Sequence, residues 1–545
     1  MFKVPHFALI LLLLDFLAAP KALASPALSV PKAVCWQPWE GELSARRNYP
    51  RFYAGIEVDV HFSGPGGTTF VVPAFWEEGR TFRFRAAFPI AGAWQWRSVA
   101  NVAEDAGLHN QSGRVEVSPY HGDNPLYQHG DLRVSLDRRY LMHADGTPFL
   151  WMGDTAWNAL WKGTIEDWRH YAGVRAAQKF SIVQTVATGA VNRNSTKDPM
   201  SGQAPFRENS EPNPAYWSDI ETKIRVANEN GLMVVLTGLG AAPAGFATQQ
   251  SGQAFARYVT GRLAGLMVIL SPSMDQRIDA QNEDAGRRLH AIATHLITQH
   301  PGTHLETSRW YHASPGTDFA GLQSGHHSGD LARAYTAARE WALELWHRTP
   351  TKPVINIEAM YDARGSNDGP NWREQDVRRC GWITWLSGSR GYTYGAGDVP
   401  PKVPGGQGGV WRFNTDAGAY DYWRTALTWP SATQMTHLRD FMAGLEWWKL
   451  VPAPELIRNQ GKDPLAQMVA SRMADGKLLV AYLPDNAEIT LDLSGLGTAS
   501  WTGHWFDPLT GKSAPIADSA ATAGGTTLRK PSGWQDATLV ITARE

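Results

Sequence analysis

The sequence predicts an α/β protein, a (β/α)8 TIM barrel flanked by an N-terminal β-sandwich and a C-terminal all-β domain. Short β-branched segments alternate with helical patterns over about 300 central residues. Alternating strand patterns without helices fill the regions before and after them. Two central segments, 266–270 and 352–357, lead into acidic residues. Strand–helix alternation is typical of a parallel barrel, whose chemistry lies at the C-terminal ends of the strands.

The length of 545 residues is too great for one hydrophobic core, so several domains are expected. At the N-terminus, Lys3 precedes an apolar run at 7–14, and the Ala-x-Ala pattern at 22–24 ends before Ser25. This pattern is typical of a signal peptide, and its apolar part is too short to span a bilayer. We therefore expect an exported protein, periplasmic or extracellular, that leaves the membrane after cleavage. The predicted units are a signal peptide at 1–24, a β-sandwich at 25–120, the barrel at 121–448 and a C-terminal β-sandwich at 449–545.

The amino-acid composition limits the kinds of molecule that the protein is expected to bind. The formal net charge of -1 gives no indication of nucleic-acid binding. The 24 Trp, 16 Tyr and 19 Phe residues suit sugar-binding clefts, where flat rings stack on sugars, although most of these rings belong in cores. The predicted partner is a plant or bacterial polysaccharide or oligosaccharide. The two cysteines, Cys35 and Cys380, are compatible with a disulfide in an exported protein and equally with two buried free thiols.

The first domain shows strand patterns in close succession. Residues 56–62 alternate with period two, a glycine-rich turn follows at 63–67, and further strand patterns occupy 69–76, 81–85 and 91–99. Short strands at this spacing indicate a sandwich. It contains no cluster of chemically reactive side chains, so we expect an accessory module.

The barrel elements follow in order. Thr164 and Asp330 are placed to cap helices, and Gly231 is placed to end one. Glycine and proline at 395–409 indicate a loop over the barrel opening. After the barrel, strands are expected at 478–483, 488–493 and 538–542. The eight predicted barrel strands are 149–154, 181–186, 232–237, 266–270, 303–308, 321–324, 353–357 and 391–395.

Two acidic residues are candidates for catalysis. Glu358 ends the seventh predicted strand and Asp275 follows the fourth, so both are expected at the barrel opening. Glycoside cleavage uses such a carboxyl pair, and a separation of about 5–5.5 Å predicts retention of configuration. We assign Glu358 as nucleophile and Asp275 as acid/base. Glu306, at the end of the fifth predicted strand, is the main competitor for Asp275.

Two other classes of function stay open. One is a non-catalytic carbohydrate-binding barrel, which the unusual sequence PSMD after the fourth predicted strand, at 272–275, favours. The other is a metal-dependent hydrolase or lyase that uses His312, His326 and His327 with Asp330. Their spacing matches no metal motif, and a helix cap already explains Asp330, so we predict no metal and no cofactor.

Several motifs resemble a known family. Residues 153–157 (GDTAW), 323–326 (QSGH), 352–358 (KPVINIE) and 393–395 (TYG) are similar to those of apiosidase-like glycoside hydrolases, the DUF4038 type of glycoside hydrolase family 140. The N-terminal part resembles the DUF5060 β-sandwich that precedes many of them. Residues 505–511 resemble the collagen-binding-like β-domain that follows them. The resemblance covers nearly the whole mature chain and implies a glycoside hydrolase.

The resemblance implies that Glu358 is one catalytic acid and that the end of the fourth strand supplies the other, for which Asp275 is the nearest candidate. Two departures lie close to the substrate. Residues 272–275 read PSMD where the family carries a Gly-Gly-Asp run, and a direct match of the strand puts Ser273 in the position of the acid. Tyr392 stands where the family often has a histidine. Apiose itself is therefore not predicted as the substrate.

The resemblance also implies that Asp154, Trp157 and His326 line the sugar subsite. A strand-end position favours Asp154 as a binding residue over a turn cap, whereas Trp157 fits a stacking platform and a core position equally well. The predicted substrate-binding residues are Asp154, Trp157, Gln323, His326, Tyr361 and Tyr394.

Overall fold

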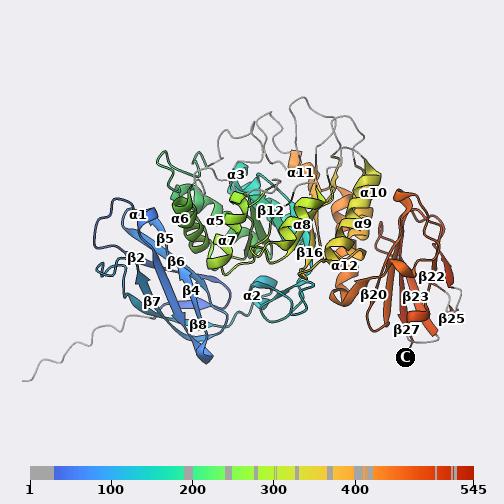
Figure 1. Ribbon diagram of the computed structural model, residues 1–545, viewed down its shortest axis with the longest axis horizontal. Coiled ribbons are helices and arrows are strands. Elements are labelled where there is room, and N and C mark those ends of the chain that lie inside the picture. Colours follow the sequence, from blue (N-terminus) through green and yellow to red (C-terminus); the bar gives the residue numbers. More distant parts are fainter. Residues whose placement is uncertain are drawn as a thin grey trace, which may run out of the picture.

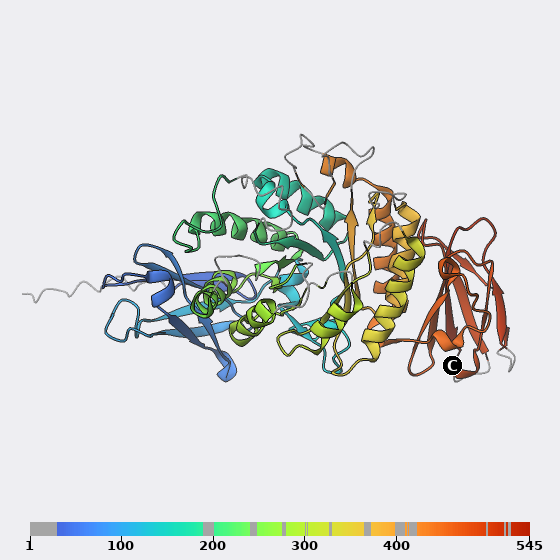
Figure 2. The same ribbon diagram turned by 45° about the horizontal axis from the view of Figure 1, so that its top comes forward.

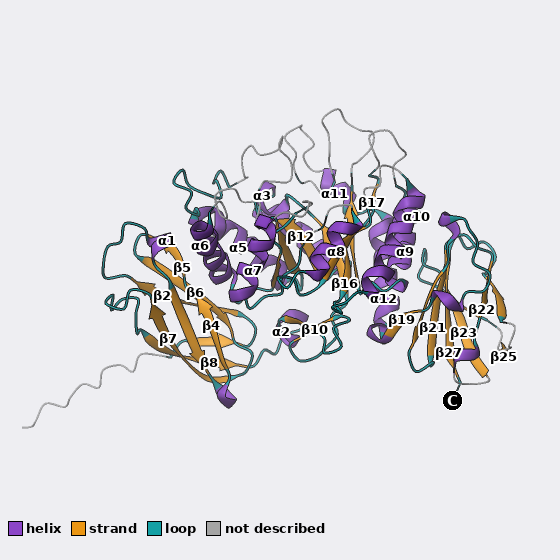
Figure 3. Ribbon diagram, in the orientation of Figure 1, coloured by secondary structure: helices purple, strands orange, loops and turns teal. Residues whose placement is uncertain are grey.

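The computed structural model describes residues 30–188, 201–239, 248–274, 280–299, 301, 304–325, 330–364, 372–397, 409–410, 413, 422–496, 500–516, 519–520 and 525–544. The chain forms three units in a row, with the barrel in the centre, an N-terminal sandwich on one side and a C-terminal sandwich on the other (Figures 1 and 2). Helices gather around the central strands, and the flanking units are built mainly from strands (Figure 3). In the described part of the chain, no helix combines the length and hydropathy needed to cross a bilayer.

The N-terminal unit is a sandwich of two sheets. A short helix, α1 (Phe52–Gly55), lies beside them. Alternation along β3 buries Val58, Val60 and Phe62 between the sheets, as the sequence pattern predicts. The first sheet, in spatial order, contains β1 (Lys32–Val34), β8 (Ser112–Ser118), β7 (Gly92–Ala100), β3 (Val58–Ser63) and β4 (Thr69–Pro73). The second contains β2 (Pro38–Ser44), β6 (Thr81–Ala87) and β5 (Phe75–Glu78).

A connecting segment leads from the sandwich to the base of the barrel, the end at which the barrel strands begin. Asn124 caps its helix by accepting a hydrogen bond from the Leu126 amide at 3.0 Å. Leu126 and Tyr127 pack with Leu132 and Leu141 under the barrel. The segment contains α2 (Pro125–His129), β9 (Leu132–Val134) and β10 (Leu141–His143).

The central sheet is a closed parallel barrel. Its hydrogen-bonded order is β14-β13-β12-β11-β18-β16-β15, and every pair along it is parallel. Ile297 closes the ring because it pairs in parallel with Leu270 of β14, and its carbonyl accepts the Asp318 amide beside β15 at 2.8 Å. The fold class predicted from the sequence is confirmed. The strands are β11 (Trp151–Thr155), β12 (Ile182–Val186), β13 (Met233–Thr237), β14 (Val268–Leu270), β15 (Ala320–Gln323), β16 (Val354–Glu358), the short β17 (Tyr361–Asp362) and β18 (Gly391–Ala396).

The fifth strand was predicted wrongly at 303–308. A helix, α8, begins at Leu305, and the fifth barrel position is held by the few residues around Ile297. A pairing segment this short has too few residues for its periodicity to show. Glu306 is therefore no longer a rival acid, because it lies on α8 with a side chain 75% exposed and an ion pair to Arg309.

Helices cover the outside of the barrel. Thr164 and Asp167 form the capping box of α4, Asp330 caps α9, and Gly231 follows α5 with a φ of 78°. The helices are α3 (Ala159–Lys162), α4 (Ile165–Ala177), α5 (Pro214–Glu229), α6 (Gln249–Leu263), α7 (Ala280–Ile292), α8 (Leu305–Ala313), α9 (Leu331–His347), α10 (Glu374–Leu386), α11 (Tyr422–Ala426) and α12 (Pro430–Ala443).

The direction of each strand side chain is set by the pleat. Trp151, Ile182 and Ile355 point into the barrel interior, where they pack in one buried cluster. Met152 and Val183, one residue further along, pack with the helix-facing core. Successive residues of a strand therefore serve different layers.

The C-terminal unit is also all-β. Its two sheets enclose a separate core that includes Leu479, Trp501 and Leu539. The larger sheet contains β19 (Leu450–Pro452), β20 (Val469–Met473), β21 (Leu478–Leu483), β27 (Ala537–Ala543), β23 (Ser500–Phe506), β24 (Ser513–Pro515) and β25 (Ser519–Ala520). The smaller contains β22 (Glu488–Leu491) and β26 (Thr526–Arg529).

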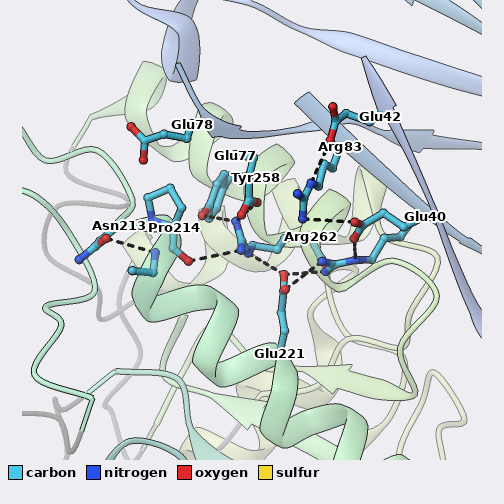
Figure 4. A network of polar contacts seen from close by, with 12 residues as sticks. Glu40, Glu42, Glu77, Glu78, Arg83, Asn213, Pro214, Glu221, Tyr258 and Arg262 are labelled. Atoms are coloured by element: carbon cyan, nitrogen blue, oxygen red, sulfur yellow. Dashed lines mark hydrogen bonds and ion pairs between the residues drawn. The ribbon is translucent and has the colours of Figure 1, made fainter. Parts of the chain in front are cut away.

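A buried ionic network joins the N-terminal sandwich to the barrel (Figure 4). Glu221 of α5 binds Arg85 of β6 at 2.6 Å and Arg262 of α6 at 2.5 Å. Glu77 of β5 also binds Arg262, at 2.9 Å, and Glu40 of β2 binds Arg85 at 2.7 Å. Charges this deeply buried need partners, so the network fixes the sandwich against α5 and α6.

The C-terminal unit is joined to α10 in a similar way. Arg378 and Asp536 form a fully buried ion pair at 2.8 Å, and Tyr482 donates to Asp536 at 2.7 Å. Cys35 and Cys380 are free and buried in the N-terminal core and the barrel core respectively.

Candidate active site

Glu358 lies at the C-terminal end of β16, at the opening that we call the mouth. All five residues of β16 are buried, and Glu358 is 3% exposed. The register between β15 and β16 shifts after Leu322, so that Gln323 pairs with Glu358. An irregularity of this kind redirects side chains, and here it brings an amide beside the carboxylate.

Within the described part of the chain, Gln323 and Tyr361 hydrogen-bond to the Glu358 carboxylate. The Nε2 of Gln323 donates to Oε2 at 2.5 Å, and the Tyr361 hydroxyl donates to Oε1. Trp157 Nε1 in turn donates to the Tyr361 hydroxyl at 3.0 Å. Hydrogen bonds to a carboxylate favour its ionised form, which is the form that a nucleophile requires.

Tyr361 is held as a donor. Burial, and then the negative charge of Glu358, raise the pKa of Tyr361 well above its ordinary value. Tyr361 therefore keeps its proton at neutral pH and directs it at Glu358. The structure thus brings together three of the residues predicted from the sequence, Gln323, Tyr361 and Trp157, around the predicted catalytic glutamate.

The end of β14 approaches the same group. Met274 packs in one buried cluster with Trp157, Val186 and Tyr361. The hydroxyl of Thr237, on β13, contacts Met274 Sδ at 3.5 Å. Asp275 is the next residue and lies outside the described residues. The described chain therefore leads from the fourth strand to the residues that hold Glu358.

Asp154 lies elsewhere. It points outward from β11 to α4, where its Oδ2 binds Arg175 Nε at 2.6 Å and accepts from the Tyr171 hydroxyl at 2.8 Å. The Asp154 and Arg175 side chains are both 0% exposed. This position does not fit the predicted role in sugar binding, because the pleat turns the side chain away from the mouth. The sequence alone did not identify Arg175 as the partner of Asp154. Arg175 lies one helical turn after Tyr171, on the side of α4 that faces the strand.

Tyr394 is also on the outward face. It is fully buried, and its hydroxyl lies 2.8 Å from Ser431 Oγ on α12. It therefore packs the strand against a helix, which does not fit the predicted contact with substrate. Trp157 is 2% exposed, with its indole in the cluster beside Tyr361, so the described arrangement favours the core alternative over an open platform. His326 lies outside the described residues.

The histidines do not form a metal site in the described residues. His312 Nε2 binds the carbonyl of Pro350 at 2.7 Å, and Pro350 precedes β16, so His312 lies near the base. His326 and His327 are outside the described part, and Asp330 caps α9. Among the residues that are described, no group of three or more His, Cys, Asp and Glu side chains is arranged to hold an ion.

Comparisons with known families match two regions. The family model "Apiosidase-like, catalytic domain" matches residues 135–449, which is more than half of the chain. The model of a collagen-binding-like domain of a collagenase matches residues 451–542. No curated protein sequence gives a significant match.

Solved structures show the same architecture. One, described as a glycoside hydrolase, is 23% identical with a TM-score of 0.67, over 77% of this chain and 98% of its own. A glycoside hydrolase family 5 protein from Bacteroides vulgatus ATCC 8482 is 22% identical with a TM-score of 0.66, over 77% and 95%. Another protein from that organism, described as a glycoside hydrolase, is 16% identical with a TM-score of 0.72, over 94% and 99%. At these identities the similarity shows the fold.

Proposed function

The chain belongs to the apiosidase-like family of glycoside hydrolases, and from this we propose that it cleaves a glycosidic bond of a poly- or oligosaccharide with Glu358 and Asp275 as the catalytic pair. The observation that carries the proposal is the Glu358 carboxylate at the end of β16, to which Gln323 and Tyr361 donate hydrogen bonds. Asp275 follows Met274, which packs against Tyr361.

Each residue has a separate task in the proposed retaining mechanism. A Glu358 oxygen forms a bond to the anomeric carbon while Asp275 gives its proton to the departing oxygen. Water then attacks the glycosyl-enzyme ester, Asp275 takes the water's proton, and Glu358 leaves as a carboxylate. Tyr361 and Gln323 position the nucleophile and do not take part in proton transfer.

The family indicates the class of substrate, and the residues after the fourth strand bear on which sugar it contains. Apiose-containing plant polysaccharides belong on the test panel because of the family match. The PSMD sequence at 272–275 departs from the family pattern at the end of the fourth strand. Tyr392, the other departure, lies on the outward face of β18, where its hydroxyl donates to the Val377 carbonyl of α10 at 3.3 Å, so it is not placed near a sugar at the mouth. We therefore propose a related pentose or hexose glycan as substrate in place of apiose.

A panel of plant and bacterial polysaccharides, with product analysis, tests the activity. On a substrate that is cleaved, Glu358→Gln is expected to lower kcat/KM by roughly 10²–10⁴-fold or more while the protein stays folded. Glu340 is 59% exposed on the outer side of α9, so Glu340→Gln is the matched control and should leave kcat/KM unchanged. Unchanged turnover in folded Glu358→Gln contradicts the mechanism, and binding without turnover across the panel indicates a binding module.

The stereochemistry has its own measurement. Proton NMR of the first product formed should show the anomer of the substrate if Glu358 is a nucleophile. The opposite anomer would mean that Glu358 activates water, as in an inverting enzyme.

Export is part of the proposal. It is supported by Lys3, the apolar run at 7–14 and the Ala-x-Ala pattern at 22–24. Mass spectrometry of the protein made in its own host should find a mature N-terminus at Ser25. An intact Met1 terminus in the active protein would contradict export.

A further inference from the structure

A chain of two hydrogen bonds leads from Trp157 to Glu358. Trp157 Nε1 donates to the Tyr361 hydroxyl at 3.0 Å, and that hydroxyl donates to Glu358 Oε1. The three side chains come from different places in the barrel, because Trp157 follows β11, Tyr361 begins β17 and Glu358 ends β16. Trp157 is 2% exposed, so this hydrogen bond is shielded from water. A change at Trp157 can therefore reach the proposed nucleophile through Tyr361.

The direction of this chain is set by its first member. An indole N–H can only donate, so the Tyr361 hydroxyl accepts from Trp157 and cannot give its own proton to it. Burial, and then the charge of Glu358, raise the pKa of Tyr361 well above its ordinary value, so that proton is present at neutral pH. A hydroxyl that accepts a hydrogen bond also donates a stronger one. Trp157 thus leaves the proton of Tyr361 available for Glu358 and strengthens the bond.

Two further contacts hold the ring of Tyr361. Tyr361 pairs with Gly395 of β18, and its ring lies so close to that backbone that it leaves no room for a Cβ at Gly395. The guanidinium carbon of Arg364 lies over the ring, 5.3 Å from its centroid, which is within the range of a cation–π interaction. Arg364 is itself closely packed, since a Cβ at Gly397 would lie 2.6 Å from the Arg364 Cβ. The ring is therefore fixed by backbone and by a cation.

Arg364 also acts on the hydroxyl through its charge. Burial and the charge of Glu358 raise the pKa of Tyr361, and the positive charge of Arg364 opposes part of that rise. An arginine keeps its charge at every pH at which a protein is folded. A more acidic hydroxyl is a stronger hydrogen-bond donor, so the cation strengthens the bond from Tyr361 to Glu358.

We propose that Trp157 and Arg364 are positioning residues, which hold Tyr361 as a donor to Glu358 and influence the reaction through Tyr361 alone. This inference rests on the proposed function, because it takes Glu358 as the nucleophile. It gives Trp157 a task inside the barrel wall in place of the predicted contact with the sugar. It gives the cation of Arg364 a task that needs no contact with substrate.

A kinetic double-mutant cycle tests this route, with reducing sugar released from a polysaccharide of the panel as the readout. In the wild-type background, Trp157→Phe is expected to lower kcat roughly 3–10-fold with KM nearly unchanged, as the loss of one hydrogen bond does. In the Tyr361→Phe background the same substitution should change kcat by less than about twofold, because the hydroxyl is already gone. An unchanged kcat, equal losses in both backgrounds, or a loss expressed mainly as a raised KM overturns the role of Trp157.

Arg364→Met gives a second cycle, and Arg364 is only partly buried, so this variant should fold even if Trp157→Phe does not. It should lower kcat about threefold or more in the wild type and less than about twofold in Tyr361→Phe, and Arg364→Lys should recover part of the loss. Two controls should leave kcat unchanged. Trp76→Phe removes an indole donor at the same 3.0 Å, to the Gly79 carbonyl in the sandwich, and Arg207→Met removes a guanidinium 5.4 Å from the Trp76 ring.

Two measurements separate this inference from the proposed function. If Glu358→Gln is inactive and the cycles are additive, Glu358 keeps its catalytic role and only the positioning role is wrong; if folded Glu358→Gln turns over substrate at the wild-type rate, both are wrong. Urea unfolding of the same variants needs no substrate. Trp157→Phe should raise the equilibrium constant for unfolding by a factor that is at least about threefold smaller in Tyr361→Phe than in the wild type, and equal factors overturn the contact itself.

Discussion

Glu221 offers a test of whether the buried network holds the N-terminal sandwich to the barrel. Its two oxygens bind Arg85 at 2.6 and 2.9 Å, and one of them also binds Arg262 at 2.5 Å. The side chains of Glu221, Arg85 and Arg262 are 6%, 4% and 1% exposed. Glu221→Gln therefore leaves two buried guanidinium groups facing a neutral amide.

The magnitude follows from that burial. Breaking a buried ion pair by removing one partner costs about 3–5 kcal/mol. Each arginine keeps a second carboxylate, Glu40 for Arg85 and Glu77 for Arg262, so we expect the low end, about 3 kcal/mol. Glu42→Gln is the matched control, since Glu42 is 59% exposed and lies 3.6 Å from Arg83, and it should cost less than about 1 kcal/mol.

Urea denaturation followed by tryptophan fluorescence measures the effect, because urea leaves ion pairs unscreened. The free energy of unfolding of the transition that includes the sandwich should fall in Glu221→Gln and not in Glu42→Gln. Equal, small losses in the two variants would refute the reasoning, since the network would then contribute no more than a surface ion pair.

Asp362, Asp154 and Tyr361 can each be tested by one substitution. Burial raises the pKa of Asp362 to about 6, so the folded protein binds this proton more tightly than the unfolded chain does. The stabilisation from the bound proton is lost as the pH rises, and the wild-type free energy of unfolding should drop by up to about 3 kcal/mol between about pH 4 and 7. Asp362→Asn should reduce that drop in pH-dependent urea melts. Asp154→Asn leaves Arg175 buried without its charge partner and should lower the free energy of unfolding in the same melts by about 3–5 kcal/mol, with KM unchanged. A raised KM in a variant of full stability would instead support a role of Asp154 in sugar binding. Tyr361→Phe removes a donor from Glu358 and should lower kcat roughly 10-fold or more in steady-state assays with little change in KM, and an unaffected kcat would exclude a positioning role.

The sequence by itself determined what is encoded locally. Thr164 and Asp330 cap their helices as expected, and a β-branched run ends at Glu358 as a buried strand does. These features depend on residues within a few positions of one another. The same local signal failed around Ile297, where a strand position consists of a few residues inside a longer polar stretch.

Only the tertiary structure decided which side chains meet. Asp154 and Tyr394 stand at strand ends in recognisable motifs, yet the pleat turns both toward the helices. Gln323 reaches Glu358 because the register between β15 and β16 shifts, and no pattern in the sequence predicts that shift. Contacts across the barrel depend on strand pairing and on the face that each residue occupies. These are properties of the closed sheet, because hydrogen bonding between distant segments fixes them.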